Sequence, residues 1–215
     1  MNEIGCFGKV PAHGDFVWQA LPARFVTPWD KWLQSELMTL REHRPDDWLQ
    51  AYLRSPIWRF LIQDEALGSS TWCGIITPSV DVVGRYFPFT IATALPRGTS
   101  VVASPRVLSP WLHHAEEAAL LALTASLSVE EVLTRVRALP LPQVQEHARE
   151  QQAPSEHPWS GQASVDESWS EHLLDQIVYK SFKAPCYWST IDAESGAVRY
   201  LLTEGFSEFS ELFAT

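Results

Sequence analysis

The sequence predicts an α/β protein: a mixed β-sheet flanked by helices, like a three-layer sandwich, folded as a single domain over residues 1–215. Short apolar runs typical of strands are interspersed with longer segments of helical periodicity. Their order is a strand, helices, three strands, helices and a hairpin, which fits neither a doubly wound sheet nor a helix bundle. With 215 residues, 46% of them apolar, the chain is long enough to bury its own core.

The N-terminal part is expected to contain a strand and two helices. Residues 4–10 predict a strand that enters a polar loop. Thr27 and Pro28 predict a helix start, with Thr27 as the N-cap. Its apolar face follows at helical spacing: Trp29, Trp32, Leu33, Leu37 and Leu40. A short second helix is expected over residues 46–53, with four inward side chains: Trp48, Leu49, Tyr52 and Leu53.

Three strands are expected next, over residues 57–62, 71–78 and 87–95. The run at 72–77 is almost entirely apolar, which is typical of a central strand covered on both faces. A second loop rich in polar residues and glycine, at 79–86, separates the last two strands. The chain therefore has two unusual loops, each directly after a strand.

Two helices should follow the third of these strands. Ser109 and Pro110 predict the start of a long helix, with Ser109 as the N-cap. Ser128 and Glu131 have the spacing of a capping box, which predicts the start of the next helix there. Pro140 ends that helix.

The C-terminal part begins with a change of composition. Residues 140–165 are rich in Gln, Glu, His, Ser and Pro and have no apolar periodicity, so we expect a polar excursion on the surface of the one domain. A helix capped by Ser170 and a hairpin of strands at 186–191 and 197–202 should follow. A short helix is expected to close the chain with four apolar residues: Phe206, Phe209, Leu212 and Phe213.

Composition excludes several classes of function. The 16 basic and 26 acidic residues give a net charge of −10, which disfavours binding to nucleic acid and to anionic membranes. No apolar run is long enough to span a membrane, and the first residues do not resemble a secretory signal. Cys6, Cys73 and Cys186 lie far apart in strand-like segments, which predicts buried free thiols in a reducing compartment. The expected location is the cytoplasm.

The first loop looks like an enzyme motif but matches no template for one. Gly8 and Lys9 lack the spacing of a phosphate-binding loop, and Pro11 removes a backbone donor. A metal site built on His13 and Asp15 would need further ligands, for which three residues are candidates: Asp81, His113 and His114. We therefore expect neither a cofactor nor a metal.

Nucleophilic catalysis is also poorly supported by the sequence. Ser79 follows a strand and lies near Asp81, but no nucleophile elbow surrounds it. None of the cysteines has basic neighbours that would mark a reactive thiolate.

A structural or docking role accounts better for the same residues. Gly14 and Gly84 are expected in backbone conformations that other residues avoid. Asp15 is expected to accept backbone hydrogen bonds within its loop. Arg85 has the reach to bridge the two loops by pairing with Asp15 or Asp81. Arg59 is expected either to bridge the loops in the same way or to stack on an aromatic ring.

At these same positions the chain resembles the TagF family of type VI secretion-associated proteins, also called ImpM. The match is dense over residues 4–95 and looser beyond, where Trp188-Ser189 and residues 203–205 suggest the C-terminal end of the family. Four blocks carry the resemblance: residues 8–16 (GKVPAHGDF), 28–33 (PWDKWL), 56–60 (PIWRF) and 78–88 (PSVDVVGRYFP).

The resemblance implies a three-layer α/β fold and a non-enzymatic, cytoplasmic accessory protein of a type VI secretion system. It implies a post-translational repressor that binds a component carrying a forkhead-associated domain. Together the motifs give these candidate interaction or loop-structuring residues: Lys9, His13, Gly14, Asp15, Arg59, Ser79, Asp81, Gly84 and Arg85.

Two alternatives remain open at this point. One is a hydrolase or phosphatase that uses four side chains: His13, Asp15, Asp81 and Arg85. The other is a permanently assembled scaffold component. The oligomeric state and the partner contacts do not follow from the sequence.

Overall fold

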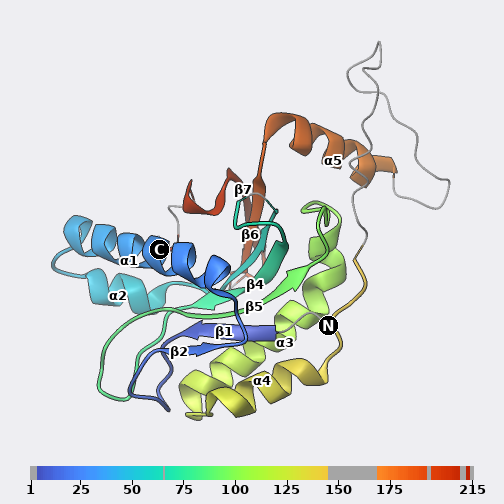
Figure 1. Ribbon diagram of the computed structural model, residues 1–215. Helices are drawn as coiled ribbons and strands as arrows, with labels where there is room; N and C mark the ends of the chain where they lie inside the picture. Colours follow the sequence, from blue (N-terminus) through green and yellow to red (C-terminus); the bar gives the residue numbers. More distant parts are fainter. Residues whose placement is uncertain (1–3, 65, 145–168, 193–194, 209–211, 214–215) are drawn as a thin grey trace.

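A computed structural model describes residues 4–64, 66–144, 169–192, 195–208 and 212–213 (Figure 1). Its centre is one seven-stranded sheet in the order β2-β1-β5-β4-β3-β6-β7. Every pairing in it is antiparallel. The strands are β1 (Ile4–Gly8), β2 (Val17–Gln19), β3 (Trp58–Ile62), β4 (Thr71–Thr77), β5 (Phe89–Leu95), β6 (Pro185–Ile191) and β7 (Val198–Glu204).

Helices cover both faces of the sheet, so the predicted α/β fold with flanking helices is confirmed. The expectation of a mixed sheet is wrong, because all six strand pairings are antiparallel. Helices α1 (Ala23–His43) and α2 (Trp48–Arg54) lie on one face. Helices α3 (Ser104–Thr124) and α4 (Val129–Ala138) lie on the other, where α3 packs on β4 and β5 and α4 packs on β1 (Figure 1). Helix α5 (Trp169–Ser181) and the 3₁₀ turn η1 (Phe206–Glu208) flank the C-terminal hairpin.

The core under α1 and α2 is dominated by aromatic rings. The indole of Trp29 lies within 4.8–6.3 Å, centroid to centroid, of five rings from α1, β3, β6 and η1: Phe25, Trp32, Phe60, Trp188 and Phe206. Its indole N–H donates to Thr90 Oγ1 at 3.0 Å, so the polar atom of this buried ring is satisfied.

The core under α3 and α4 is mainly aliphatic. The alanines Ala115, Ala118, Ala119 and Ala122 give α3 a smooth buried face that lies close to β4. Cys6 and Cys73 are in this layer, and Cys186 is in the aromatic one. All three cysteines are buried thiols outside any disulfide, as predicted. Burial raises the pKa of the Cys6 thiol to about 12, so it stays protonated.

Two predicted helix starts are wrong. Helix α1 begins at Ala23, so Thr27 is not the N-cap and Pro28 lies inside the helix. Helix α3 begins at Ser104, so Ser109 is not its N-cap and Pro110 is interior. Burial of the preceding residues outweighs the local signal: Phe25 and Val26 in α1, and Ser104 and Leu108 in α3, are all buried.

Other elements match more closely. The capping box of Ser128 and Glu131 is present at the start of α4, and the hairpin β6–β7 pairs as predicted. Leu53, predicted to face inward, is 55% exposed. Strand β2 was not predicted. The polar excursion lies largely outside the described residues, as do the side chain of Ser170 and Phe209. No helix in the described part of the chain is long and apolar enough to cross a membrane.

Candidate functional site

The sheet order brings the two unusual loops together. Gly8, the last residue of β1, pairs with Phe89, the first residue of β5. Phe89 also pairs with Thr77, the last residue of β4. The first loop (residues 9–16) therefore leaves the sheet at the same end as the second loop (residues 79–86).

Asp81 joins these two loops. Its carboxylate Oδ2 accepts from Lys9 Nζ at 2.5 Å and from Arg85 Nε at 2.7 Å. Its Oδ1 accepts from the backbone N–H groups of Val83 at 3.0 Å and Arg85 at 2.8 Å. Four donors thus converge on one side chain, two of them from cations.

The donors around Asp81 keep its carboxyl group ionised. Burial alone would raise the pKa of the Asp81 carboxyl, but the hydrogen bond from Lys9 and those from Arg85 and Val83 outweigh it and hold that pKa well below its usual range. Lys9 is only 4% exposed, and its ammonium also lies 4.7 Å from the centroid of the Phe16 ring. Lys9 and Asp81 therefore form a buried ion pair that fixes one loop to the other.

Arg85 completes the connection at the surface. Besides its bond to Asp81, its guanidinium donates to the carbonyl oxygen of Gly14 and lies 3.8 Å from the carboxylate of Asp15. The Arg85 side chain is 56% exposed. The structure thus confirms the expectation that Arg85 bridges the two loops.

His13 ties the first loop to a third element. Its backbone carbonyl accepts from Val82 N–H at 3.2 Å, within the pair of loops. Its ring Nε2 accepts from the N–H of Val129, the first residue of α4, at 3.3 Å. His13 thereby satisfies one of the N–H groups that a helix start leaves without an intrahelical partner.

Ser79 is buried and fully engaged. Its hydroxyl donates to the carbonyl of Lys9 at 2.6 Å. Its backbone N–H donates to the hydroxyl of Tyr52 at 2.8 Å, and its carbonyl accepts from that hydroxyl at 2.7 Å. Ser79 therefore anchors the second loop to both the first loop and α2.

The loop glycines only partly match expectation. Gly84 has a φ of +86°, as predicted for a position that other residues avoid. Gly14 does not have a positive φ, and that prediction is wrong. Gly8 has it instead, with φ +129°, and a Cβ there would lie 2.0 Å from the carbonyl oxygen of Pro88. The close approach of β1 to the end of the second loop requires a glycine at position 8.

Two further expectations are corrected by the geometry. The Asp15 side chain is fully exposed and lies 3.8 Å from Arg85, whereas Asp81 accepts the loop's backbone hydrogen bonds. Arg59 does not reach the loops. Its guanidinium forms a two-pronged pair with Glu116 of α3, at 2.6 and 2.7 Å, and a bond to Ser109 Oγ at 3.2 Å. Arg59 therefore attaches α3 to the sheet.

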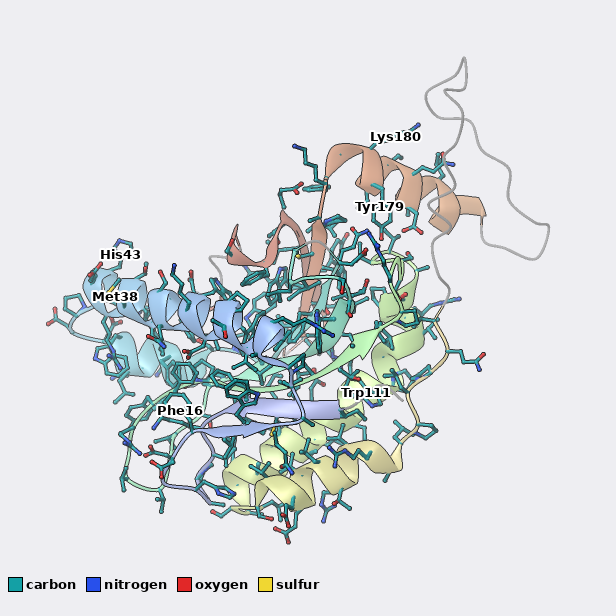
Figure 2. The ribbon with its side chains drawn as sticks, viewed as in Figure 1. Phe16, Met38, His43, Trp111, Tyr179 and Lys180 are labelled. Carbon is teal, nitrogen blue, oxygen red and sulfur yellow. The ribbon has the colours of Figure 1, made fainter. Side chains whose placement is uncertain are left out.

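The exposed part of the loops is apolar with a charged rim. Val82 and Val83 are 65% and 67% exposed, and Phe16 is 48% exposed. We call the exposed side chains of five residues the two-loop surface: Asp15, Phe16, Val82, Val83 and Arg85. Phe16 lies at the left of the view in Figure 2, on the same side of the molecule as Met38 of α1.

A groove of about 480 Å³ extends this surface toward α1. Phe87, whose ring lies 4.8 Å from that of Phe16, forms part of its wall. Six other residues line it: Gln34, Leu37, Met38, Arg41, Glu42 and Tyr86. The two-loop surface and the groove together offer apolar contact area beside opposite charges, which is the composition of an interface core with a polar rim.

Three polar side chains of the loops are hydrogen-bonded within the chain. Asp81 accepts four hydrogen bonds, the Ser79 hydroxyl donates to the carbonyl of Lys9, and His13 Nε2 accepts from α4. Within the described residues, no group of three or more His, Cys, Asp or Glu side chains is placed to hold a metal ion. The arrangement is suited to holding a rigid surface.

Sequence reasoning missed several residues that build this site. Tyr52 was expected only as an inward residue of α2, and nothing in its local pattern points to a bond with Ser79. The aromatic cluster of Phe7, Phe16 and Phe87 beneath the loops was also missed, although each of these residues flanks a loop. A search for aromatic residues at both ends of the two loops would have found it.

Comparison with known proteins gives two findings. The chain matches the family model described as the TagF N-terminal domain, type VI secretion system-associated, over residues 5–139. It is similar to the crystal structure of PA0076 from Pseudomonas aeruginosa PAO1, at 28% identity and a TM-score of 0.77, over 98% of this chain and 92% of that one. No curated protein matches. The matched range contains both loops, and the structural likeness continues into the C-terminal hairpin.

Proposed function

We propose, from the premise that this chain belongs to the TagF family of type VI secretion system-associated proteins, that it is a non-enzymatic, cytoplasmic regulator that acts by binding another protein. The finer proposal is post-translational repression of secretion. The partner we propose is the component of the apparatus that carries a forkhead-associated domain.

The observation that carries this proposal is the two-loop surface itself. The buried pair of Lys9 and Asp81 holds the loops together from beneath, Arg85 joins them at the surface, and three of the five exposed side chains are apolar. A surface fixed before binding loses little conformational freedom when a partner docks. Of the four groups that the alternative hydrolase would use, Asp81 is buried in its ion pair with Lys9 and the His13 ring is bonded to α4, which supports a binding role.

The direct test is binding between purified components. Val82→Asp/Val83→Asp introduces two charges at exposed positions whose side chains make no internal hydrogen bond. We expect the affinity for the forkhead-associated component to fall at least about tenfold, as is common when an interface core is charged. Leu120→Asp is the matched control, since Leu120 is 46% exposed on α3, on the other face of the sheet. Equal binding by the loop variant and the control would rule out this surface.

The sign of regulation is tested in cells. Deletion of the gene should raise type VI secretion, and wild-type protein should lower it again. The Val82→Asp/Val83→Asp variant should fail to restore repression, whereas Leu120→Asp should restore it. If deletion lowers secretion, the protein is a required scaffold component and repression is wrong.

Catalysis is tested on the same material. We expect purified protein to leave phosphoester and peptide substrates unchanged. Turnover that disappears in His13→Ala would overturn the proposed non-enzymatic role.

A further inference from the structure

Strand β7 ends the sheet as an open edge. It pairs with β6 over seven consecutive residue pairs, from Pro185–Glu204 to Ile191–Val198. No strand in the described part of the chain lies on its other side. The opposite edge, β2, has only three residues. A long open edge presents a row of backbone groups that another strand can pair with.

Two hydrogen bonds at the ends of the hairpin show which backbone groups face outward. Asp192 N–H donates to Ala197 C=O at 2.9 Å at one end of the hairpin, and Gly205 N–H donates to Ala184 C=O at 3.0 Å at the other. Because bonded and non-bonded pairs alternate in an antiparallel ladder, the odd-numbered residues of β7 bond to β6. The N–H and C=O groups of the even-numbered residues therefore point away from the sheet: Val198, Tyr200, Leu202 and Glu204.

The side chains at this edge are exposed and apolar. Tyr200 and Val198 are 69% and 58% exposed, and Ile191, which pairs with Val198, is 43% exposed. Residues two apart or directly opposite share one face of a sheet, so these three form one stripe.

Natural edge strands are commonly protected by charged side chains, Pro or a bulge. β7 has no Pro and its register is unbroken. Its two charged side chains are engaged within the chain: Arg199 lies over the Trp58 ring, and Glu204 accepts from the N–H groups of Lys183 and Ala184.

We propose that this edge pairs with the same edge of a second copy of the chain, antiparallel about a two-fold axis through Leu201. Leu201 is the midpoint of β7, and the four outward residues lie symmetrically about it. Val198 then pairs with Glu204 of the partner subunit, and Tyr200 pairs with Leu202 of the partner subunit. Each outward backbone group of one strand then faces an outward backbone group of the other strand. A register centred on Tyr200 would pair only three of the four outward residues of each strand.

A second copy of the chain is the favoured partner of the β7 edge. The same strand then supplies both halves of the interface, as an isologous two-fold contact requires. The new contact covers one strand and the stripe beside it, so it belongs to the small, weak class of interfaces. The net charge of −10 makes two copies repel each other, and salt screens that repulsion. The dimer should therefore be concentration-dependent and tighter at higher salt.

Sedimentation velocity of the full chain tests the dimer, from about 5 to 500 μM, the range for weak contacts. We expect a shift from monomer to dimer that moves to lower concentration when NaCl is raised. Tyr200→Pro removes an outward N–H without removing a bond to β6, and should weaken the dimer at least tenfold. Met38→Thr, at an apolar position 57% exposed on α1, is the control and should not weaken it.

A cross-link tests the register and does not depend on affinity. Two copies of Leu201→Cys would face each other at the axis in a non-hydrogen-bonded pair, about 4.5 Å apart at Cα and within disulfide reach. Arg199→Cys is the matched control, since each Arg199 would lie opposite Thr203 of the partner subunit. We expect mild oxidation to link Leu201→Cys and not Arg199→Cys. The three native cysteines are buried and are not in disulfides, and they should not react.

Three outcomes would overturn the proposal. The first is a monomer at every concentration and salt. The second is a dimer that Tyr200→Pro leaves intact, or equal linking of both cysteine variants. The third is a monomer whose edge binds a strand of another protein and loses that binding in Tyr200→Pro. The proposed regulatory role is tested separately, because Val82→Asp/Val83→Asp should leave the dimer unchanged.

Discussion

Single residues determine how the two loops are held. Asp81 alone collects four hydrogen bonds, and Gly8 alone permits β1 to approach Pro88. The sequence could single out both loops because glycine and aspartate are unusual beside apolar runs. It could not distinguish Asp81 from Asp15, or Gly8 from Gly14, because that depends on which neighbour each residue meets after folding.

The pH dependence of stability should report on Asp81. Its folded-state pKa is lowered from an ordinary value of 3.8, so its contribution is fully present above that pH and is lost as the pH falls through the lower folded pKa. Asp81→Asn leaves Lys9 buried without its counter-charge and should be clearly destabilised at pH 7. The difference in free energy of unfolding between this variant and the wild type, measured with urea, should shrink below about pH 3.8. A gap that stays constant from pH 7 to pH 3 would contradict this account.

Two glycines with positive φ should respond differently to alanine. Gly84→Ala has open space around the new Cβ and should cost about 1–2 kcal/mol, the strain of that conformation. Gly8→Ala adds a clash with backbone at 2.0 Å and should cost at least about 3 kcal/mol. Denaturant unfolding of both variants measures the difference. Equal losses would show that the Pro88 contact relaxes easily.

At the level of elements, the ends of the helices were harder to predict than the positions of the helices and strands. Five helices and six of the seven strands lie where periodicity predicted them, because buried faces repeat over several residues. The starts of α1 and α3 were misplaced since Thr27-Pro28 and Ser109-Pro110 resemble helix starts. In α1, the carbonyl of Pro22 instead accepts from both Phe25 and Val26, at 2.9 and 3.1 Å, and begins the helix earlier.

The start of α4 has two caps from different parts of the chain. Ser128 caps it locally, and His13 caps it from the first loop. His13→Ala and Ser128→Ala should each cost about 1 kcal/mol, the usual effect of losing a cap. Only His13→Ala should also weaken partner binding, because it releases the first loop. Thermal unfolding, hydrogen exchange at Val129 and a binding assay check this. Unchanged exchange at Val129 in His13→Ala would count against the contact.

At the level of the whole molecule, the aromatic layer connects elements from both ends of the chain. Trp29 contacts rings from β3, β6 and η1. Helical spacing predicted that Trp29 lies on a buried face, but not that its ring would join residues so distant in sequence. The edge position of β7 could likewise not be predicted from the sequence, because edge and central strands differ in the strands that lie beside them.

Two tryptophans with opposite environments make a paired test of this layer. Trp29→Ala removes a fully buried ring and should cost about 3–5 kcal/mol. Trp18→Ala removes a ring that is 53% exposed, and should cost about 1 kcal/mol or less, since little area is returned to water. Urea unfolding at pH 7 measures both. Similar losses would show that the aromatic layer does not dominate stability.

The strand order also has a consequence for synthesis. β3 receives its second neighbour, β6, only after residue 185 has been made, since Arg59 pairs with Ser189. Until then β3 is itself an exposed edge on a nascent chain, next to the unfilled half of the aromatic layer. Closing so long a loop is slow. The unfinished chain therefore has a period of vulnerability to aggregation on the ribosome, which the last hairpin ends.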